Sequence, residues 1–402
     1  MLKANIKNDF PVFQNNDLVY LDSAASALTP KPVIEALKEY YTDYSVNVHR
    51  GVYRLSYQAT KKYEEARQTI ADHIGATFAE TIFTRGASSA LNLVASSYGM
   101  ANLKPGDEII VSELEHHSHL LPWQQVAKKT GAKLVFVPLT KAGRITVENF
   151  KKVLNDHTKM VALTHVSNVM GYQTPIEEII RLAHEKNALV SVDAAQSVPH
   201  QSVDVKAMDC DFLSFSGHKM CGPTGIGVLY GKKALLDAME PIEFGGDMND
   251  YVDKQTAHFK DTPYKFETGT PPIAQALGLA EAFRYLDAIG FDDIKAHEKA
   301  LLNKTIEALN NIEGVVVYNP SAETAIIAFN LNDVHPHDAV SFFDEDQIAL
   351  RAGHHCAQTV IQFLGVPATL RAAFYIYNTE ADVERFIKNV KEAIAFFKAA
   401  GF

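Results

Sequence analysis

Lys219 lies in a stretch of sequence whose neighbours favour chemical reactivity. The segment SFSGHKMCGPTGIG (214–227) surrounds this lysine with glycines, a methionine and Cys221. A partly desolvated lysine has a lowered pKa and can form a Schiff base with a carbonyl compound. A surface turn, with the lysine extended into water, is the alternative. We favour the reactive role because Asp193 ends a neighbouring predicted strand.

Asp193 and the segment RGASSALNLVASSYG (85–99) supply the groups that such a lysine would need as partners. A carboxylate at the end of a buried strand can bind a ribose hydroxyl, a metal ion or a protonated ring nitrogen, or it can cap a helix. Small hydroxyl residues open the predicted helix of 85–99, and free N–H groups at a helix start suit a phosphate. Ser216 and His218 precede Lys219 and could donate to the same phosphate. A Schiff-base lysine, a carboxylate for a ring nitrogen and a phosphate cradle together predict a pyridoxal 5′-phosphate (PLP) site.

The segment RAGHHCAQ (351–358) brings two histidines next to Cys356. Adjacent residues of an extended segment point to opposite faces, so these three side chains are not expected to converge on one metal ion. No second Cys/His pair has the spacing of a zinc site, and the polar neighbours argue against a core cysteine. The thiolate is the reactive form of cysteine, and Arg351 and the imidazoles would favour it. Cys356 is therefore predicted to be a nucleophile.

Alternating strands and helices would position these residues over the first two thirds of the chain. Amphipathic helices are predicted at 57–74, 87–98, 121–130 and 175–186, the last one capped by Thr174 with Pro175 in its first turn. Strands are predicted at 81–84, 109–112, 133–138, 159–165, 188–193, 212–216 and 226–231. This alternation predicts an α/β fold with a mostly parallel, seven-stranded sheet, whose ligands bind beyond the carboxyl ends of the strands.

The pattern changes near residue 270 and predicts a second, smaller α+β domain. Two long helices, 272–287 and 291–312, follow one another with no strand between them. Short strands, a helix at 337–345 and a final helix at 380–399 come next. We expect three parts: an N-terminal segment that packs with the small domain, a large PLP-binding domain, and a small C-terminal domain that carries the nucleophile loop, at 1–22, 23–285 and 286–402.

Composition excludes several classes of protein. The 402 residues carry a net charge of −10, which disfavours a nucleic-acid or anionic-membrane surface. No apolar run approaches the ~18 residues that a membrane-spanning helix needs, and the N-terminus lacks the apolar core of a signal peptide. Three cysteines are too few for a disulfide framework. These features predict a cytoplasmic protein.

Several motifs together resemble one known family. Asp193-Ala194-Ala195-Gln196, followed by the SGHKM motif (216–220), is similar to the class V aminotransferases, which are PLP enzymes of fold type I. Within that family, further motifs along the whole chain resemble the group II, SUF-type cysteine desulfurases: LDSAAS (21–26), NVHRGVYRLS (47–56), EHHSHLLPW (115–123), THVSNVMG (164–171), FETGTP (266–271) and RAGHHCAQ.

The resemblance implies a role for each matching residue. Lys219 would carry the cofactor, Asp193 would pair with its ring nitrogen, Gln196 would contact its phenolic oxygen, and His116 would stack on the ring. The residues expected to hold the phosphate are Ser88, Ser216 and His218, joined across a homodimer by Gly269 and Thr270 of the partner subunit. The residues expected to bind the substrate are Asn168, Arg371 and Ala25.

The implied reaction converts L-cysteine to L-alanine and leaves a persulfide on Cys356. The sulfur would pass to an acceptor protein of the SUF system for iron–sulfur cluster assembly. Selenocysteine lyase is the alternative within PLP enzymes, and a PLP-binding regulatory or sulfur-relay protein is the alternative outside catalysis. Three positions depart from the family pattern: Ser88 stands where threonine is frequent and keeps the hydroxyl, Tyr53 stands where histidine is frequent, and Cys221 stands where tyrosine is frequent. Cys221 is expected to be a small packed residue, with a second reactive thiol as the alternative.

Overall fold

The larger of two main sheets has seven strands in the order β2-β8-β7-β6-β5-β3-β4. The computed structural model describes residue 2 and residues 4–401. All neighbouring pairs are parallel except those that β8 makes with β7 and β2, so the predicted mostly parallel sheet is confirmed. The strands are β2 (Thr81–Thr84), β3 (Glu108–Val111), β4 (Lys133–Phe136), β5 (Thr158–Thr164), β6 (Leu189–Asp193), β7 (Phe212–Ser216) and β8 (Gly227–Gly231).

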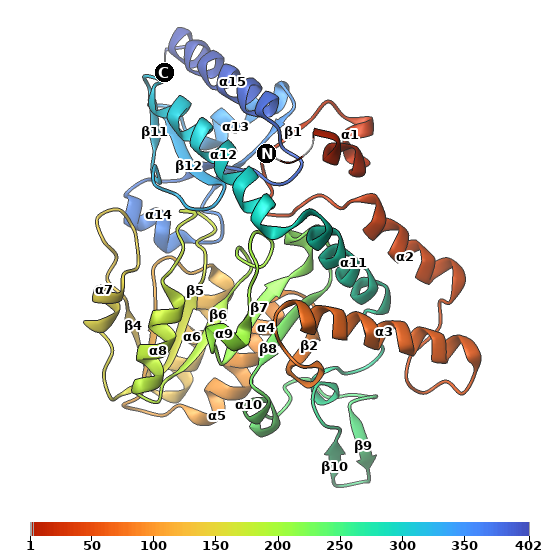
Figure 1. Ribbon diagram of the computed structural model, residues 1–402. Helices are drawn as coiled ribbons and strands as arrows, with labels where there is room; N and C mark the ends of the chain where they lie inside the picture. Colours follow the sequence, from red (N-terminus) through yellow and green to blue (C-terminus); the bar gives the residue numbers. More distant parts are fainter. Residues whose placement is uncertain (1, 3, 402) are drawn as a thin grey trace.

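Helices cover both faces of this sheet (Figure 1). Alternate residues of β3 show why: Ile109 and Val111 pack in one apolar cluster with α4 and α6, whereas Ile110 packs in another with α3, α8 and α11. The helices are α2 (Lys31–Asp43), α3 (Arg54–His73), α4 (Ala87–Leu93), α5 (Met100–Asn102), α6 (His117–Thr130), α7 (Val147–Lys151), α8 (Ile176–Glu185), α9 (Val205–Met208), α10 (Lys233–Ala238) and α11 (Ile273–Ile289).

A second sheet has four antiparallel strands in the order β11-β12-β15-β14. Helices α12, α13 and α15 pack against it in the upper part of Figure 1, around a separate apolar cluster that includes Leu301, Phe329 and Phe386. The strands and helices here are β11 (Val315–Val317), β12 (Ile326–Leu331), β14 (Arg351–Gly353), β15 (Thr369–Ala373), α12 (Phe291–Asn310), α13 (Pro336–Glu345), α14 (Gln358–Leu364) and α15 (Glu380–Ala399).

The N-terminal residues lie beside the second sheet. After a 3-10 helix (Ala4–Asp9) and the short helix α1 (Val12–Asn15), strand β1 (Val19–Tyr20) pairs in parallel with β13 (Ile348–Ala349). Val19 and Leu21 belong to the apolar cluster of the second sheet. The predicted domain boundaries at residues 22 and 285 remain predictions. Helices α11 and α12 meet at Gly290, whose φ of 94° favours glycine.

Two local predictions are corrected. Helix α8 begins at Ile176, and its N-cap residue is Pro175, so Thr174 does not cap it and its hydroxyl has no partner among the described residues. The helix predicted at 87–98 is α-helical only to Leu93, continues as a π-helix over Val94–Gly99, and ends in α5.

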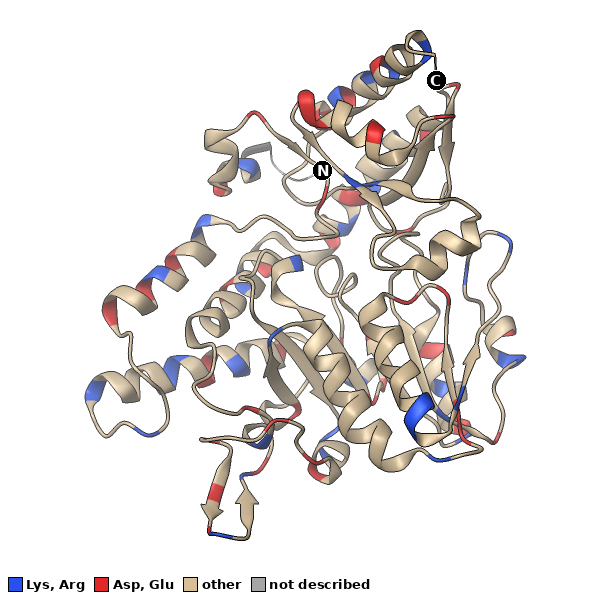
Figure 2. Cartoon of the chain, turned by 180° about the vertical axis from the view of Figure 1, so that it is seen from behind, with Lys and Arg blue, Asp and Glu red and all other residues tan. Residues whose placement is uncertain are grey.

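A hairpin of β9 (Asn249–Val252) and β10 (Ala257–Phe259) projects from the lower edge of the molecule in Figure 1. Charged residues of both signs are interspersed along the outer helices and loops (Figure 2). Among residues 2 and 4–401, no helix combines the length and the apolar character required to cross a membrane.

Candidate active site

A cavity of about 320 Å³ lies between the carboxyl edge of the large sheet and strands β14 and β15 of the second sheet. It gathers most of the residues singled out in the sequence, although they come from elements far apart along the chain. The predicted site residues that line it are Ala25, Ser88, His116, Asn168, Asp193, Ser216, His218, Lys219, Cys356 and Arg371.

Lys219 lies in the 3-10 helix Gly217–Lys219, directly after β7. Burial lowers the pKa of its amine to about 8; Asp193 opposes this shift, and Arg371 adds to it. A minor but reactive fraction of Lys219 is therefore neutral near neutral pH, and this fraction grows as the pH approaches 8. A neutral amine is the form that attacks a carbonyl carbon and that accepts a proton.

Asp193 and His116 lie with Lys219 around the same cavity. Asp193 ends β6 and is buried, and its Oδ1 accepts a hydrogen bond from the N–H of Ala195 at 3.0 Å. Its Oδ2 has no partner among the described residues, which leaves it available to a protonated ring nitrogen. His116 caps α6, with Nδ1 accepting from the N–H of Ser118 at 3.1 Å. Burial and the nearby Lys219 lower the pKa of His116 to about 4, so its ring is neutral at neutral pH.

The start of helix α4 forms an anion-binding corner of the cavity. Gly86 has a φ of 151°, a conformation that favours glycine. A Cβ on the facing Gly227 would lie 2.5 Å from the Gly86 Cα, so Gly227 must be glycine for α4 to approach β8 this closely. The Ser88 and Ser118 hydroxyls are 2.6 Å apart, and Ser216 accepts from the N–H of Ala87 at 2.7 Å. The N–H groups of Ser88 and Ser89 have no acceptor in the described chain, as a phosphate site requires.

His218 lines this part of the cavity, and Gln196 lies next in the chain to Ala195, which also lines it. Burial and the nearby Lys219 lower the pKa of His218 to about 4, and its Nδ1 lies 3.4 Å from the hydroxyl of Ser26. Gln196 is buried, and its side-chain amide donates to the carbonyl of Ala24 at 2.6 Å. The amide oxygen of Gln196 has no partner in the described residues. These polar groups fit a bound PLP, since each retains hydrogen-bonding capacity that the protein does not use.

Arg371 of β15 is 2% exposed and lies at the cavity with one Nη donating to the carbonyl of Asn168 at 2.9 Å. Its other Nη is 3.3 Å from Asp22, and its Nε has no partner among the described residues. Burial lowers the pKa of Arg371 to about 10, with Asp22 opposing the shift, so the guanidinium remains charged at neutral pH. The unpaired donor makes Arg371 suited to a substrate carboxylate.

Asp22 is a site residue that the sequence did not reveal. Its carboxylate accepts from Arg371 and also from Arg351, whose Nη2 is 2.7 Å away. It therefore aligns two arginines at the edge of the cavity. The available signal in the sequence was that Asp22 follows the apolar residues around β1. Its arginine partners could not be recognised, because they lie more than 300 residues away in the chain.

Cys356 is exposed, whereas Cys210 and Cys221 are buried. The segment at Cys356 is a turn, as its polar residues suggest, but the extended geometry used to argue against a metal ion is wrong, because His355 and Cys356 both have φ of 53°, in the left-handed region. The two histidines do not contact the thiol through their Nε2 atoms: His354 bonds to the carbonyl of Pro367, and His355 bonds to Thr369. Cys221 is buried, and this burial raises the pKa of its thiol. Cys356 is therefore the accessible thiol at the cavity.

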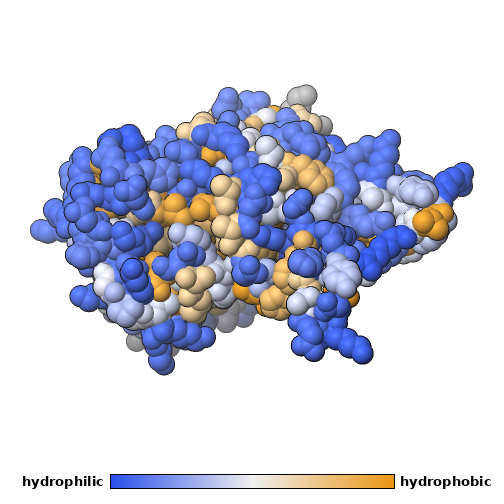
Figure 3. Space-filling view, turned by 90° about the horizontal axis from the view of Figure 1, so that it is seen from below, coloured by the Kyte–Doolittle hydropathy of each residue, from blue (hydrophilic) through white to orange (hydrophobic). Residues whose placement is uncertain are grey.

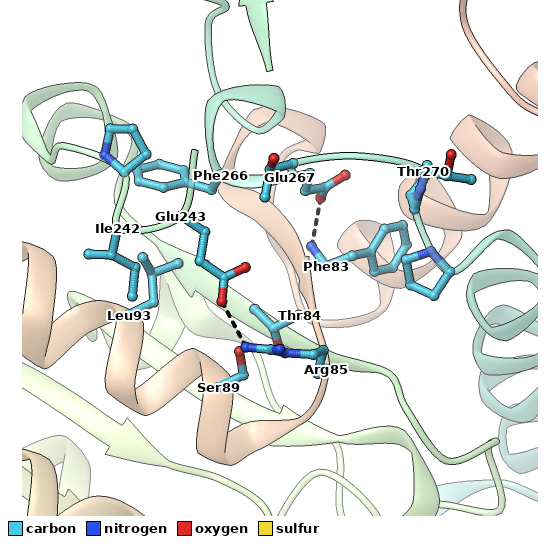
Figure 4. Close-up of a pocket in the computed structure, with 14 residues that line it drawn as sticks. Phe83, Thr84, Arg85, Ser89, Leu93, Ile242, Glu243, Phe266, Glu267 and Thr270 are labelled. Carbon is cyan, nitrogen blue, oxygen red and sulfur yellow. Dashed lines mark hydrogen bonds and ion pairs between the residues drawn. The ribbon is translucent and has the colours of Figure 1, made fainter. Parts of the chain in front are cut away.

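Gly269 and Thr270 do not lie in this cavity. Thr270 lines a second cavity of about 310 Å³, with Thr84, Arg85, Ser89 and Phe266 (Figure 4). The N–H of Gly269 donates to the carbonyl of Gly246 at 2.8 Å. The two cavities lie on either side of the first turn of α4, since Ser88 lines one and Ser89 lines the other.

No group of three or more His, Cys, Asp or Glu side chains in the described parts of the chain is arranged to hold a metal ion. The first cavity offers a lysine amine with a lowered pKa, a buried carboxylate, an anion corner, a buried arginine and an exposed thiol. These are the groups needed to activate an amino acid at Cα and to receive an atom from its side chain.

Comparison with known proteins identifies relatives along nearly the whole chain. A probable cysteine desulfurase of Halalkalibacterium halodurans is 51% identical over 397 residues, which cover 98% of each chain. One of Staphylococcus aureus is 50% identical over 396 residues, covering 97% of this chain and 96% of the relative.

Solved structures of cysteine desulfurases are also similar to this chain over nearly its whole length. The apo cysteine desulfurase of Thermococcus onnurineus superposes with a TM-score of 0.94 at 42% identity over 98% of each chain. The cysteine desulfurase CsdA of Escherichia coli, in an S-sulfonic acid form, gives 0.93 at 38% identity over 98% of this chain and 99% of CsdA. The model of the aminotransferase class-V family matches residues 19–386. The chain therefore belongs to the class-V aminotransferase family.

Proposed function

We propose that the protein is a PLP-dependent L-cysteine desulfurase of the group II, SUF type. The observation that carries the proposal is the meeting of Lys219, Arg371 and the exposed Cys356 around one cavity. The arginine alone is enough to bind an amino acid by its carboxylate. A transaminase would need the lysine in addition to the arginine, but it would not need a thiol. An accessible thiol at the same cavity is needed when the product is a transferred sulfur atom.

PLP supplies the electron sink that stabilises negative charge at the substrate Cα. The protein groups would hold it at both ends, with Asp193 at the ring nitrogen and the start of α4 at the phosphate. His116, neutral because its pKa is about 4, can lie against the ring without adding a positive charge. Gln196, with its unpaired buried oxygen, lies beside them.

The protein's own residues account for the remaining steps. Arg371, together with Asn168 and Ala25, would fix the substrate carboxylate, and the neutral Lys219 amine would remove the Cα proton. The Cys356 thiolate then attacks the sulfur of the substrate. The bond between the substrate Cβ and its sulfur breaks, and its electron pair stays with the carbon. A persulfide remains on Cys356, and protonation of Cβ leads to L-alanine.

The same proposal includes the setting of the enzyme. We infer a homodimer in which Gly269 and Thr270 reach the phosphate of the partner subunit. Ile242 lines the same cavity as Thr270, and Gly269 bonds to Gly246, next to Asp247, which bonds to His49 and Arg50. Large apolar side chains are exposed in the stretches that these contacts join. The side chains are Val52, Tyr53, Tyr57, Ile242, Phe244, Tyr251 and Val252. Figure 3 shows apolar surface across the middle of the lower face, and contiguous surface of this kind marks an interface.

A sulfur-acceptor protein of the SUF system would take the persulfide sulfur for iron–sulfur cluster assembly in the cytoplasm. Selenocysteine is a second substrate to consider, since it would occupy the same contacts. Relative turnover of the two amino acids would separate a desulfurase from a selenocysteine lyase.

The test is the fate of the sulfur. After brief exposure to L-cysteine, mass spectrometry should find one additional sulfur on the peptide that contains Cys356, and alanine should accumulate. Cys356→Ser should retain PLP and bind cysteine but form neither product. Cys221→Ser is the matched control, and it should keep both products because this thiol is buried. An added sulfur on Cys221 would overturn the assignment.

A further inference from the structure

The backbone of Cys356 and the residues that follow it is bonded twice by a single residue, His117. The backbone N–H of His117 donates to the carbonyl of Cys356 at 2.7 Å. The imidazole Nε2 of the same residue accepts from the N–H of Gln358 at 3.0 Å. Both bonds join the first residue of α6 to the segment that enters α14, more than 200 residues later in the chain.

The backbone of this segment needs such support. His355 and Cys356 both adopt φ of 53°, and Gly353 adopts 128°. Two consecutive side-chain-bearing residues in the left-handed region are disfavoured, because Cβ approaches the following carbonyl oxygen. A free segment would relax toward other conformations and carry the thiol away from its place. Contacts from outside the segment must therefore stabilise this conformation.

Other contacts hold the segment at one point each. Asn168 donates its side-chain amide to the carbonyl of His355 at 2.8 Å. The hydroxyl of Thr359 donates to the carbonyl of Glu113 at 2.7 Å. His117 differs because it bonds at two points, Cys356 itself and Gln358, and directly follows His116, which lines the cavity.

The imidazole of His117 can accept only while it is neutral. Burial lowers its pKa, and the neighbouring His354 acts in the same direction. Nε2 therefore keeps its lone pair for the N–H of Gln358 at neutral pH. That N–H belongs to the first residue of α14, which has no acceptor within its own helix.

We propose that His117 is a positioning residue that fixes the Cys356 thiol for sulfur transfer. This inference rests on the proposed desulfurase function. His117 has no part in binding PLP or in removing the Cα proton, because the groups for those steps lie elsewhere around the cavity. Loss of its imidazole should slow the attack of the thiol on the substrate sulfur and leave the earlier steps intact.

The experiment compares two substitutions in the PLP-loaded enzyme. His117→Leu keeps the backbone bond but removes the imidazole acceptor, whereas His117→Gln places a side-chain oxygen near the position of Nε2. Each variant is assayed with L-cysteine and with β-chloroalanine. Chloride leaves from Cβ without a nucleophile, so elimination from β-chloroalanine reports the PLP and lysine chemistry alone.

We expect His117→Leu to lower the turnover of L-cysteine by about tenfold, which is in the range expected for one lost hydrogen bond and a slightly misplaced reacting group. Its KM for L-cysteine and its β-chloroalanine elimination should stay close to those of the wild type. His117→Gln should recover most of the lost turnover. The rate at which iodoacetamide alkylates Cys356 should change in the leucine variant and return in the glutamine variant.

Unchanged cysteine turnover in His117→Leu would overturn the proposal. An equal loss of both reactions in that variant, with no recovery in His117→Gln, would also overturn it, because it would show damage to the whole cavity. The proposed function would fail differently, since wild-type enzyme would then release no alanine from L-cysteine at all.

Discussion

Burial lowers the pKa of two cationic side chains of the site, with different results. Lys219 has a neutral fraction at neutral pH, since its pKa is about 8 and its carboxylate neighbour only partly offsets the cost of burial. Arg371 starts from a much higher value and remains charged with a pKa of about 10. One cavity thus provides a neutral amine for covalent chemistry and a permanent cation for a carboxylate.

The pKa of Lys219 predicts how PLP uptake depends on pH. The amine attacks the PLP aldehyde only when neutral, so the uptake rate of PLP-free protein should rise with pH and be half-maximal near pH 8. The growth of the visible absorption band measures this rate. Lys219→Ala should show no such band, and borohydride reduction followed by peptide mapping should label Lys219 in the wild type. A label on Lys232 or Lys233 would contradict the assignment.

Arg371→Ala should raise the KM for L-cysteine about tenfold to a hundredfold, because a charge-assisted hydrogen bond to the substrate carboxylate is lost. Steady-state alanine formation measures this change. Arg181→Ala serves as a control, since that arginine is exposed on α8 and remote from the cavity. If the KM is unchanged in Arg371→Ala, the carboxylate binds elsewhere.

Residues of the site differ in how far the sequence could reveal them. Lys219 and Asp193 were predictable because each follows a recognisable buried strand. Asp22 and His117 were not, since their meaning lies in hydrogen bonds to residues far along the chain. Gly269 and Thr270 were expected at the phosphate of the partner subunit, which stays a prediction; within one chain Thr270 lines the second cavity.

At the scale of elements, strands were predictable to within two residues at their ends, because their apolar runs are short and bounded by polar residues. The turn at 354–356 was not, since side-chain types alone do not indicate left-handed backbone at histidine and cysteine. The π-helical turn at Val94–Gly99 carries no pattern that separates it from an α-helix. Tertiary contacts decide such details.

Helix α3 and the segment before Gly269 are joined by a buried ion pair. Arg67 is fully buried and donates to both carboxylate oxygens of Glu267, at 2.6 and 2.8 Å. Arg67→Met should lower the free energy of unfolding by about 3–5 kcal/mol, because Glu267 would remain buried without its partner. Urea denaturation measures the change.

Two further variants test whether the loss of stability comes from leaving Glu267 buried without its partner. Arg67→Met combined with Glu267→Leu should recover only part of the loss, since the N–H of Phe83 also bonds to Glu267. Arg181→Ala removes an exposed ion pair and should cost less than about 1 kcal/mol. A similar cost for the buried and exposed pairs would show that burial is not the cause.

At the scale of the whole molecule, the site exists only because two sheets meet. The large sheet supplies Lys219, Asp193 and the start of α4, and the second sheet supplies Arg371 and the segment that carries Cys356. Neither sheet alone presents both the amine and the thiol. A change in how the two sheets pack would therefore alter sulfur transfer before it altered PLP binding.

The first turn of α4 has a consequence for the behaviour of the protein in solution. Ser88 and Ser89 face two different cavities, so anything that orders this turn from one side favours binding on the other. If Thr270 reaches the phosphate of a second subunit, as proposed, association and PLP binding are linked equilibria, and each must strengthen the other by the same factor. Diluted enzyme should then lose PLP as it dissociates, and added PLP should hold it together. Sedimentation at several protein concentrations, with absorbance recorded for PLP, would measure this coupling, and PLP content independent of concentration would exclude it.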